Sequence, residues 1–505
     1  MESLNPEVFS FKNITKTFAS VLANHEVSFS VAEGTIHGVV GENGAGKSTI
    51  MKILYGMFEP DSGTIHFQGK PRSIPDPQTA ISLGIGMVHQ HFMLVPTLTV
   101  WENIILGKEP SKWLLDKASI LKQLKSLKTK FGFQVDLEAK IESLSVGHQQ
   151  QVEILKLLYR KANILILDEP TAVLSPQEVE SLFEKLKLLK KAHKTIVIIT
   201  HKLKEILSFT DSVTVMRQGK AIETLPTSSL TEDSLAEKII GRKRIPLNFE
   251  KSGFEPEPVL KVASLSLSEA HNSILRHISF EINRGEIVGI AGIEGNGQHE
   301  LIEVLAGVEK NYSGTVILNQ ENIKELSAYD LKQKGFSLIP PDRHLEGVIL
   351  PFSLAENAIL GHHRDPQIKS GPFLSSTKIT QLASQLIQSF DIRPGEPSQS
   401  IAGLSGGNQQ KLVVARETAR EVSFLLAAHP TRGIDIGAID FIHQYFLKLK
   451  AQGTAMLLIS SELEEILKLS DRILVLYRGE IVAQVLKNEA TEKDLGLWMT
   501  GGSKK

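Results

Sequence analysis

The sequence predicts an α/β protein made of two tandem copies of one unit, and three observations support this prediction. A glycine-rich loop containing a lysine and a serine lies between an apolar run and a helical pattern. Further apolar runs end in acidic or other polar side chains, as the buried strands of a parallel sheet do. The same order of segments occurs twice along the 505 residues, and a repeat of that length indicates duplicated domains.

The glycine-rich loop has the pattern G-x-x-x-x-G-K-S. It lies between the apolar run at 36–40 and apolar residues at helical spacing, which is the strand–loop–helix context that this motif requires. Its glycines let backbone N–H groups form an anion nest, and the helix that follows turns its positive end to the same phosphates. Lys47 is expected to reach the outer phosphates, and the Ser48 hydroxyl is expected to hold Mg²⁺. The predicted phosphate-binding residues are Gly41, Glu42, Asn43, Gly44, Ala45, Gly46, Lys47, Ser48 and Thr49.

Two candidate residues lie on either side of this loop. Phe18, in a polar stretch upstream, could stack on an adenine ring, although a core phenylalanine is the commoner interpretation of one such residue. Downstream, the glycine-flanked apolar run at 84–88 leads to Gln90, whose amide could touch Mg²⁺ or an attacking water. The lysine-rich segment at 110–140 has leucines at helical spacing and is interpreted as a helix with a solvated face.

Two later apolar runs end in chemically active side chains. The run at 164–167 is followed by Asp168 and Glu169. Asp168 can hold Mg²⁺ through water, and Glu169 can polarise a water for attack on a γ-phosphate. The run at 195–200 ends at His201, which could contact that phosphate, although a single histidine is more often structural. The pattern therefore predicts a nucleotide site with Glu169, His201 and Gln90 as the catalytic candidates, and Ser48, Gln90 and Asp168 as the metal candidates.

The composition of the chain argues against several classes of protein. The 56 basic and 57 acidic residues leave a formal charge of −1, which gives no general attraction to nucleic acid or to an anionic membrane. Cysteine is absent, so disulfides and cysteine-ligated metals are excluded. The chain starts without a signal-peptide pattern, and no apolar run approaches the ~20 residues of a membrane-spanning helix. We therefore expect a soluble chain that does not insert into a membrane by itself.

The repeat aligns the two halves but does not preserve their chemistry. Gly292 lies 251 positions after Gly41, and Leu404 lies 260 positions after Leu144, so the second half has nine extra residues between these points. At the positions of Lys47, Ser48, Asp168, Glu169 and His201, the second half has Gln298, His299, Ala428, His429 and Ser461. The second half is therefore predicted to be unable to hydrolyse a nucleotide by itself.

The order of these motifs resembles that of the ATP-binding cassette (ABC) family. The likeness rests on the phosphate loop, Gln90, the segment Leu144-Ser145-x-Gly147, Asp168-Glu169 and His201, and it covers the whole chain because the pattern occurs twice. It implies two tandem P-loop cassettes, each with a mostly parallel sheet, an antiparallel β part and a helical subdomain. The expected divisions are a first cassette at 1–245, a linker at 246–258 and a second cassette at 259–505.

The resemblance also implies what the protein works with. ATP and Mg²⁺ are the expected cofactors. Transmembrane permease subunits are the expected partners, with an extracytoplasmic substrate-binding protein as an indirect partner and no nucleic acid. The expected location is the cytoplasmic face of the inner membrane, where the chain would be peripheral.

In this family, two cassettes face each other head to tail, and the signature segment of one closes the phosphate loop of the other. The intact residues of the first half would then meet the intact signature of the second, and the altered residues of the second would meet the altered segment at 144–148 and Ser175. Because every intact element falls in one site, this sorting supports the crossed arrangement. The residues expected to complete the working site are Ser405, Gly406, Gly407, Asn408 and Asp435.

Within the family, the chain resembles ATPases of bacterial importers for simple sugars and nucleosides, through the segments 87–96, 404–411 and 430–435. Ribose- and galactose-type members usually keep an Asp–Glu pair in the second half, whereas Ala428 and His429 here favour a purine or pyrimidine nucleoside. A monosaccharide importer is the alternative. A soluble twin-cassette factor that acts on ribosomes is a more distant one, because such factors typically keep both ATP sites and carry a long charged linker.

Overall fold

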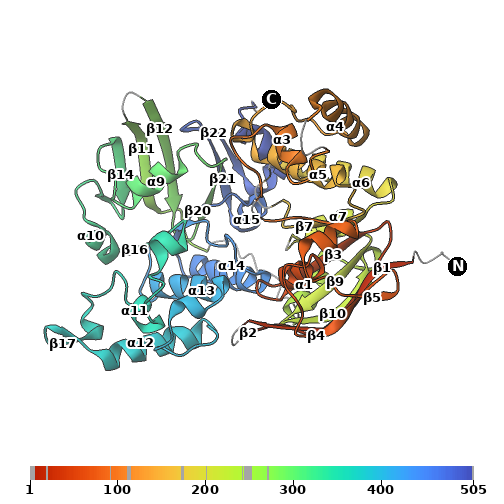
Figure 1. The fold of residues 1–505 in the computed structure, drawn as a ribbon. Helices are drawn as coiled ribbons and strands as arrows, with labels where there is room; N and C mark the ends of the chain where they lie inside the picture. Colours follow the sequence, from red (N-terminus) through yellow and green to blue (C-terminus); the bar gives the residue numbers. More distant parts are fainter. Residues whose placement is uncertain are drawn as a thin grey trace. The chain divides into compact units, whose positions relative to one another are not determined.

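The computed structural model describes residues 6–18, 21–90, 92–110, 115–171, 174, 176–200, 202–241, 243, 253–269 and 272–502. The chain divides into two compact units, Met1–Arg244 and Ile245–Lys505, and each is considered by itself. Each unit combines a six-stranded sheet, a four-stranded antiparallel sheet and a group of helices (Figure 1). This architecture confirms the predicted α/β fold class. Residues 246–252 of the expected linker lie outside the described residues, so the predicted domain limits stay a prediction.

In the first unit, the antiparallel sheet has the strand order β2-β1-β4-β5, and the larger sheet has the order β10-β9-β3-β8-β7-β6. Neighbours in the larger sheet run parallel except β9 and β10. The strands are β1 (Glu7–Phe18), β2 (Val21–Ala32), β3 (Ile36–Gly41), β4 (Ser62–Phe67), β5 (Lys70–Arg72), β6 (Ile85–Val88), β7 (Ile164–Asp168), β8 (Thr195–Ile199), β9 (Ser212–Arg217) and β10 (Lys220–Pro226). The helices are α1 (Lys47–Leu54), α2 (Pro77–Ser82), α3 (Val100–Ile105), α4 (Lys117–Phe131), η1 (Ile141–Ser143), α5 (Val146–Tyr159), α6 (Pro176–Lys191), α7 (Leu203–Phe209), η2 (Thr227–Ser229) and α8 (Glu232–Ile240).

The second unit repeats this plan, with the strand orders β12-β11-β14-β15 and β16-β19-β20-β13-β21-β22 and a small added hairpin. Its strands are β11 (Pro258–Glu269), β12 (Asn272–Asn283), β13 (Ile287–Ala291), β14 (Ser313–Leu318), β15 (Glu321–Asn322), β16 (Phe336–Ile339), β17 (Lys369–Ser370), β18 (Phe373–Leu374), β19 (Phe424–Ala428), β20 (Ala455–Ile459), β21 (Arg472–Tyr477) and β22 (Glu480–Leu486). Its helices are α9 (Gln298–Leu305), α10 (Ala328–Gln333), η3 (Arg343–Gly347), α11 (Leu354–Ala358), η4 (Pro366–Ile368), α12 (Ser376–Ser389), η5 (Ile401–Gly403), α13 (Gly406–Glu417), α14 (Ile436–Ala451), α15 (Leu463–Leu469), η6 (Lys487–Glu489) and α16 (Glu492–Met499).

Each unit buries both faces of its larger sheet. In the first unit, one apolar cluster joins that sheet to α1 and the antiparallel sheet and includes Phe11, Met51 and Ile166. A second cluster joins the opposite face to helices α3 to α6 and includes Ile104 and Leu155. Strands β7 and β8 are therefore covered on both sides, which is why their sequences are continuously apolar rather than alternating. The carboxyl ends of these parallel strands form the edge that carries the candidate site.

The nine extra residues of the second unit fall in two places. Strand β16 begins 251 positions after β6, but Ile349 lies 254 positions after Val95. These two residues are equivalent because each donates its N–H to an asparagine side chain, Asn357 or Asn103. Three extra residues therefore lie in the loop after β16. The other six lie between Asn357 and Leu404, in the stretch that contains η4 and the hairpin of β17 and β18.

Candidate functional site

The phosphate loop leaves β3 and ends at the first residue of α1. Gly44 and Gly46 have φ angles of +82° and +89°, a backbone conformation that residues other than glycine rarely adopt. A Cβ at Gly41 would lie 2.2 Å from a backbone oxygen of β9. Lys47 is buried, and its Nζ donates to the carbonyl oxygens of Gly41 and Glu42 at 2.8 Å each. The predicted loop is thus a tight turn folded around its lysine.

Asn24 on β2 supports this loop and was missed by reasoning from the sequence. Its side chain is fully buried, and its Nδ2 donates to the carbonyl oxygen of Gly46 at 3.1 Å. Its Oδ1 is buried without a hydrogen-bond partner in the described part of the chain. The available signal was an asparagine inside a strand, where this residue type is depleted. Asn24 therefore ties the antiparallel sheet to Gly46, the residue directly before α1.

Two polar pairs lie beside the loop, at the carboxyl ends of β6 and β7. Ser48 Oγ donates to Asp168 Oδ1 at 3.0 Å, and Gln90 Nε2 donates to Glu169 Oε2 at 3.1 Å. Glu169 follows β7 with a φ of +49°, and its N–H donates to the carbonyl oxygen of Ile199 at the end of β8. The structure therefore brings four predicted residues together from three distant segments.

Burial dominates the electrostatics of Asp168. It raises the pKa of this carboxyl above its usual value, the hydrogen bond from Ser48 lowers it in part, and the negative charge of Glu169 raises it further. A buried carboxyl of this kind is stabilised in its ionised form by a nearby cation. The charges of Lys52 and Lys47 act in that direction in the protein itself.

The donor atoms at this edge fit Mg²⁺. This ion prefers oxygen ligands and is usually held by one or two carboxylates together with substrate phosphates, rather than by a protein cage. Within the described ranges no three His, Asp or Glu side chains form a metal cluster. Ser48 and Asp168 instead offer one hydroxyl and one carboxylate beside the phosphate loop. This pair suits an ion that is held jointly by the protein and a nucleotide.

Two other predicted residues have different outcomes. Phe18, at the end of β1, is 38% exposed and meets Phe58 edge-on with ring centroids 5.0 Å apart. A core position is therefore wrong for Phe18, because more than a third of the residue is exposed; its stacking on adenine stays a prediction. His201, like Ser175, lies outside the described residues.

The predicted signature residues lie together within the second unit. The Ser405 Oγ caps α13 by accepting from the N–H of Asn408, whose side chain donates back to the same oxygen at 3.0 Å. Asp435 caps α14 by accepting from the N–H of Ala438 at 2.8 Å. A Cβ at Gly407 would lie 2.5 Å from Asp435 Oδ2 and 2.9 Å from Ala438 Cβ, so this glycine packs closely against the start of α14 in its own unit. Gly406 is the first residue of α13.

Comparison with known proteins decides the family. A family model described as ABC transporter matches residues 24–172 and 275–432. The chain belongs to the ABC transporter family. It is 43% identical over 502 residues to the "Nucleoside import ATP-binding protein NupA" of Lactococcus lactis subsp. cremoris, which covers 99% of each chain. It is also similar to the "Guanosine import ATP-binding protein NupO" of Bacillus subtilis (44% over 502 residues, 99% of this chain and 98% of the relative).

A sugar-related protein is nearly as similar. The "Glucose import ATP-binding protein TsgD13" of Haloferax volcanii is 41% identical over 524 residues, with 97% of this chain and 95% of the relative covered. These matches run over nearly the full chain and include both cassettes. The predictions of an ABC transporter ATPase and of two tandem cassettes are therefore confirmed.

Membership of the family implies ATP as a ligand and permease subunits as partners. In the part of the chain that the structure describes, no helix combines the length and the apolar character needed to cross a bilayer. The candidate site therefore lies in the first cassette of an ABC ATPase, which also contains the candidate catalytic side chains.

The second cassette of this ABC ATPase keeps the loop but changes its contacts. The Gln298 Nε2 donates to the carbonyl oxygen of Ile293 at 3.0 Å, and its Oε1 accepts from the N–H of Asn296 at 3.1 Å. His299 turns to Glu303 on its own helix, with 3.4 Å between Nε2 and Oε1. At the end of β19, Ala428 is fully buried. The described residues of this cassette therefore offer no counterpart of the Ser48–Asp168 pair.

The residue at the position of Glu169 is also changed in the second cassette. His429 has a φ of +46°, close to the +49° of Glu169, so the backbone turn after the strand is preserved. Its Nδ1 accepts from the N–H of Ser461 at 3.3 Å. Burial, reinforced by the charge of Arg432, lowers the pKa of this imidazole and favours its neutral form. A neutral histidine held as an acceptor is not equivalent to the carboxylate of Glu169.

Proposed function

We propose that this ABC ATPase energises the import of a nucleoside, with ATP hydrolysed at the first cassette. One observation carries the hydrolytic part: the Gln90–Glu169 and Ser48–Asp168 pairs converge beside the phosphate loop. A carboxylate for water, an oxygen pair for Mg²⁺ and a phosphate cradle are the parts that γ-phosphate hydrolysis needs. The second cassette has the cradle without the other two.

Each residue of the first cassette has a proposed role. Residues 41–49 and the charge of Lys47 hold the phosphates, and Ser48 and Asp168 hold Mg²⁺, which when bound neutralises charge that develops on them. Glu169 orients the attacking water and draws its proton, while Gln90 holds the Glu169 carboxylate in place. His201 would contact the γ-phosphate, and Phe18 would stack on the adenine.

The other side of the site is proposed to come from the second cassette. Ser405, Gly406, Gly407 and Asn408 present the start of α13, whose N-terminal N–H groups suit a phosphate. Asp435 lies against Gly407 and would approach the same nucleotide. The support is the sorting of motifs: each residue that the second cassette has lost would belong to the other, inactive site. The proposed divisions are a first cassette at 1–245, a linker at 246–258 and a second cassette at 259–505.

The substrate class rests on the second half and on the relatives. NupA and NupO are named for nucleoside and guanosine import, and their similarity extends over 99% of this chain. The alternative is a monosaccharide, because TsgD13, named for glucose import, is 41% identical. A purine or pyrimidine nucleoside is preferred because Ala428 and His429 replace the Asp–Glu pair that ribose- and galactose-type ATPases usually keep.

The proposed assembly follows from the import function. Permease subunits would form the path across the membrane, and a substrate-binding protein outside the membrane would deliver the nucleoside to them. The chain itself would lie at the cytoplasmic face of the membrane as a peripheral subunit.

An uptake experiment tests this function. Cells that lack the chain would be complemented with the parent protein, with Glu169→Gln or with His429→Gln, and supplied with labelled guanosine, uridine, ribose and galactose. We expect nucleoside uptake with the parent and His429→Gln, none with Glu169→Gln, and sugar uptake that does not depend on the chain. Normal nucleoside uptake with lost ribose uptake would instead favour the monosaccharide alternative.

A further inference from the structure

The loop after β16 in the second cassette places an arginine against the signature segment. Arg343 is the first residue of η3. Its Nη1 donates to the carbonyl oxygen of Arg432 at 2.7 Å, and its Nη2 lies 3.5 Å from the carbonyl oxygen of Gly433. A Cβ added at Gly406 would lie 2.7 Å from the same Nη2. The guanidinium is thus inserted between the turn that leads to Asp435 and the first residue of α13.

Neighbouring residues fix this loop at its start. Asp342 caps η3 by accepting from the N–H groups of His344 and Leu345 at 2.8 and 3.1 Å. The His344 ring lies 2.9 Å from Gln409 Oε1, so the loop also bonds to α13 one turn beyond the signature glycines. Arg343 therefore projects from a segment that is already attached to the signature helix.

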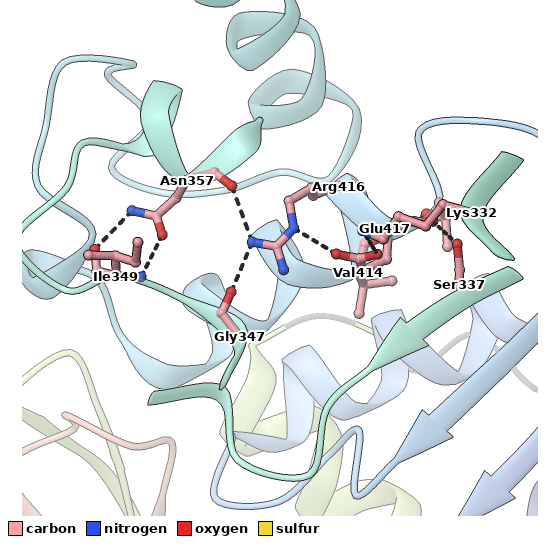
Figure 2. A network of polar contacts seen from close by, with 9 residues as sticks. Lys332, Ser337, Gly347, Ile349, Asn357, Val414, Arg416 and Glu417 are labelled. Atoms are coloured by element: carbon pink, nitrogen blue, oxygen red, sulfur yellow. Dashed lines mark hydrogen bonds and ion pairs between the residues drawn. The ribbon is translucent and has the colours of Figure 1, made fainter. Parts of the chain in front are cut away.

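A buried charge network fixes the other end of the loop. Figure 2 shows the guanidinium of Arg416 between the carbonyl oxygens of Gly347 and Asn357, at 2.8 and 3.2 Å. The same guanidinium bonds to Glu417 at 2.8 Å, and Glu417 also meets Lys332 at 3.2 Å. Burial alone would raise the pKa of Glu417, but the charges of Arg416 and Lys332 outweigh it and hold this pKa below its usual value. A network with charged partners on both sides stays ionised and rigid.

In both cassettes, an asparagine side chain clamps the end of the loop through two backbone hydrogen bonds, but the loop of the first cassette contains no arginine. Asn103 bonds to Val95 through both its Oδ1 and its Nδ2, as Asn357 does with Ile349. The loop before that clamp is three residues shorter, and the stretch 89–94 contains no arginine or lysine. The cation is therefore an addition to the cassette whose signature is intact.

We propose that Arg343 is a positioning residue for ATP hydrolysis, which holds the signature glycines and the turn before Asp435 in one fixed arrangement. This inference rests on the proposed function, because it gives the second cassette's signature a part in the reaction at Lys47. The planar guanidinium donates to the turn through Nη1 and Nη2 while its Nη2 also lies against Gly406, and a lysine cannot reproduce this geometry. Small displacements of groups that position a substrate cost up to about 10²-fold in rate.

The test compares variants of the full chain in the assembled transporter. We would measure ATPase kcat and KM, binding of a fluorescent ATP analogue and thermal unfolding for Arg343→Ala, Arg343→Lys and Glu169→Gln. Arg276→Ala is the matched control, since Arg276 is a half-exposed arginine of the same cassette that pairs only weakly with Glu480, at 3.6 Å. For Arg343→Ala we expect kcat to fall about 10- to 100-fold, with KM and analogue affinity within about threefold of the parent. The kcat of Arg343→Lys should lie between those of the parent and Arg343→Ala.

Two results would overturn the inference about Arg343, and a third would refute the proposed function as well. A parent-like kcat in Arg343→Ala, with Glu169→Gln inactive, would show that Arg343 does not position the signature, although the hydrolytic site would stand. A kcat loss in Arg343→Ala and Arg343→Lys that follows the loss of folded protein in the unfolding curves would show a structural role alone. Parent-like hydrolysis in Glu169→Gln would refute the proposed function itself.

Discussion

The two phosphate loops of this chain have the same shape but are held by different side chains. In the first, the Lys47 Nζ bonds to two carbonyl oxygens of its own loop. In the second, the Gln298 amide bonds to the carbonyl of Ile293 and also accepts the N–H of Asn296. A neutral side chain that both donates and accepts can therefore replace a cation in folding the loop, although it brings no charge to phosphate.

The same contrast extends to the strands around the loops. Asp168 and Ala428 end equivalent strands, and only the first offers an oxygen to Ser48 or to a metal ion. His37 on β3 and Asn24 on β2 are replaced by Val288 and Leu275, 251 positions later in each case. The second cassette has thus exchanged polar groups for apolar ones while keeping the fold. The difference indicates which side chains serve the nucleotide and which serve the architecture.

Glu169, the proposed general base, should show the largest difference between the cassettes. Glu169→Gln keeps the shape of the side chain but removes the carboxylate that takes a proton from water. We expect kcat to fall by about 10² to 10⁴-fold, the usual contribution of a general base. Steady-state ATPase assays of the assembled transporter would measure this effect. His429→Gln, at the equivalent position, should change kcat less than about twofold, and equal losses in the two variants would show that both cassettes hydrolyse ATP.

A buried histidine on β3 should make the first cassette lose stability in acid. His37 lies between the hydroxyls of Ser212 and Thr214 at 2.8 Å each, and burial lowers its pKa to about 4, against a small opposing effect of the Asp211 charge. An unfolded histidine titrates near 6.5, so the unfolded state binds more protons between the two values. The contribution of His37 to the free energy of unfolding is therefore complete above about pH 6.5. It is lost as the pH falls toward 4, by about 3 kcal/mol in total.

Hydrogen exchange during urea unfolding, followed in peptides from β3 and β13, would measure this acid sensitivity. His37→Val copies Val288 of the second cassette and should abolish the loss of stability that His37 itself causes between pH 6.5 and 4. At neutral pH this variant is expected to be less stable than the parent, because the hydroxyl of Ser212 loses its partner. An unchanged pH dependence in His37→Val would mean that other groups control the acid response.

Exchanging the side chains of the two loops tests their chemistry directly. Lys47→Gln copies the second loop and removes the cation that is proposed to bind the phosphates. A hydrogen bond from such a charged group is worth about 1.5–3 kcal/mol. We expect ATP affinity to fall about 10- to 150-fold, as measured by titration with a fluorescent analogue. Gln298→Lys should not create hydrolysis, because Ala428 and His429 still provide no carboxylate. Hydrolysis that survives Glu169→Gln only when Gln298→Lys is present would contradict this.

Much of the fold and half of the site could be predicted because the sequence marks them locally. Strands β3, β7 and β8 lie within one residue of the predicted runs, since they are buried on both faces and end at glycine, acid or polar residues. In strands β1 and β2, by contrast, bulges at Asn13 and Glu26, both with positive φ, interrupt the alternation that would mark a half-buried strand. The pairing of Ser48 with Asp168, 120 positions apart, follows from the parallel order of the sheet.

Other features have no local signal. The Nη atoms of Arg343 reach a turn that lies about 90 positions later, at Arg432 and Gly433. Nothing in the residues around Arg343 indicates that contact, because it depends on how the loop after β16 is clamped by Asn357. Asn24 is a similar case, since its role depends on a strand of the antiparallel sheet passing directly below Gly46.

Asn24 gives the smallest expected effect. Replacing it separates two roles of a buried polar residue, which are to support the phosphate loop and to stabilise the fold. Asn24→Leu copies Leu275 of the second cassette, which packs against Gly297 at the equivalent place. The variant loses the hydrogen bond to the Gly46 carbonyl, worth about 0.5–1.5 kcal/mol, so ATP affinity should fall by at most about 2- to 12-fold, the value expected when all of this free energy serves to hold the phosphate loop for the nucleotide. It also removes a buried oxygen that has no partner in the described residues, so the free energy of unfolding should stay equal or rise. ATP titration and urea unfolding of the same preparation would show the two changes in opposite directions. A fall in stability without a change in affinity would mean that Asn24 supports the sheet rather than the phosphate loop.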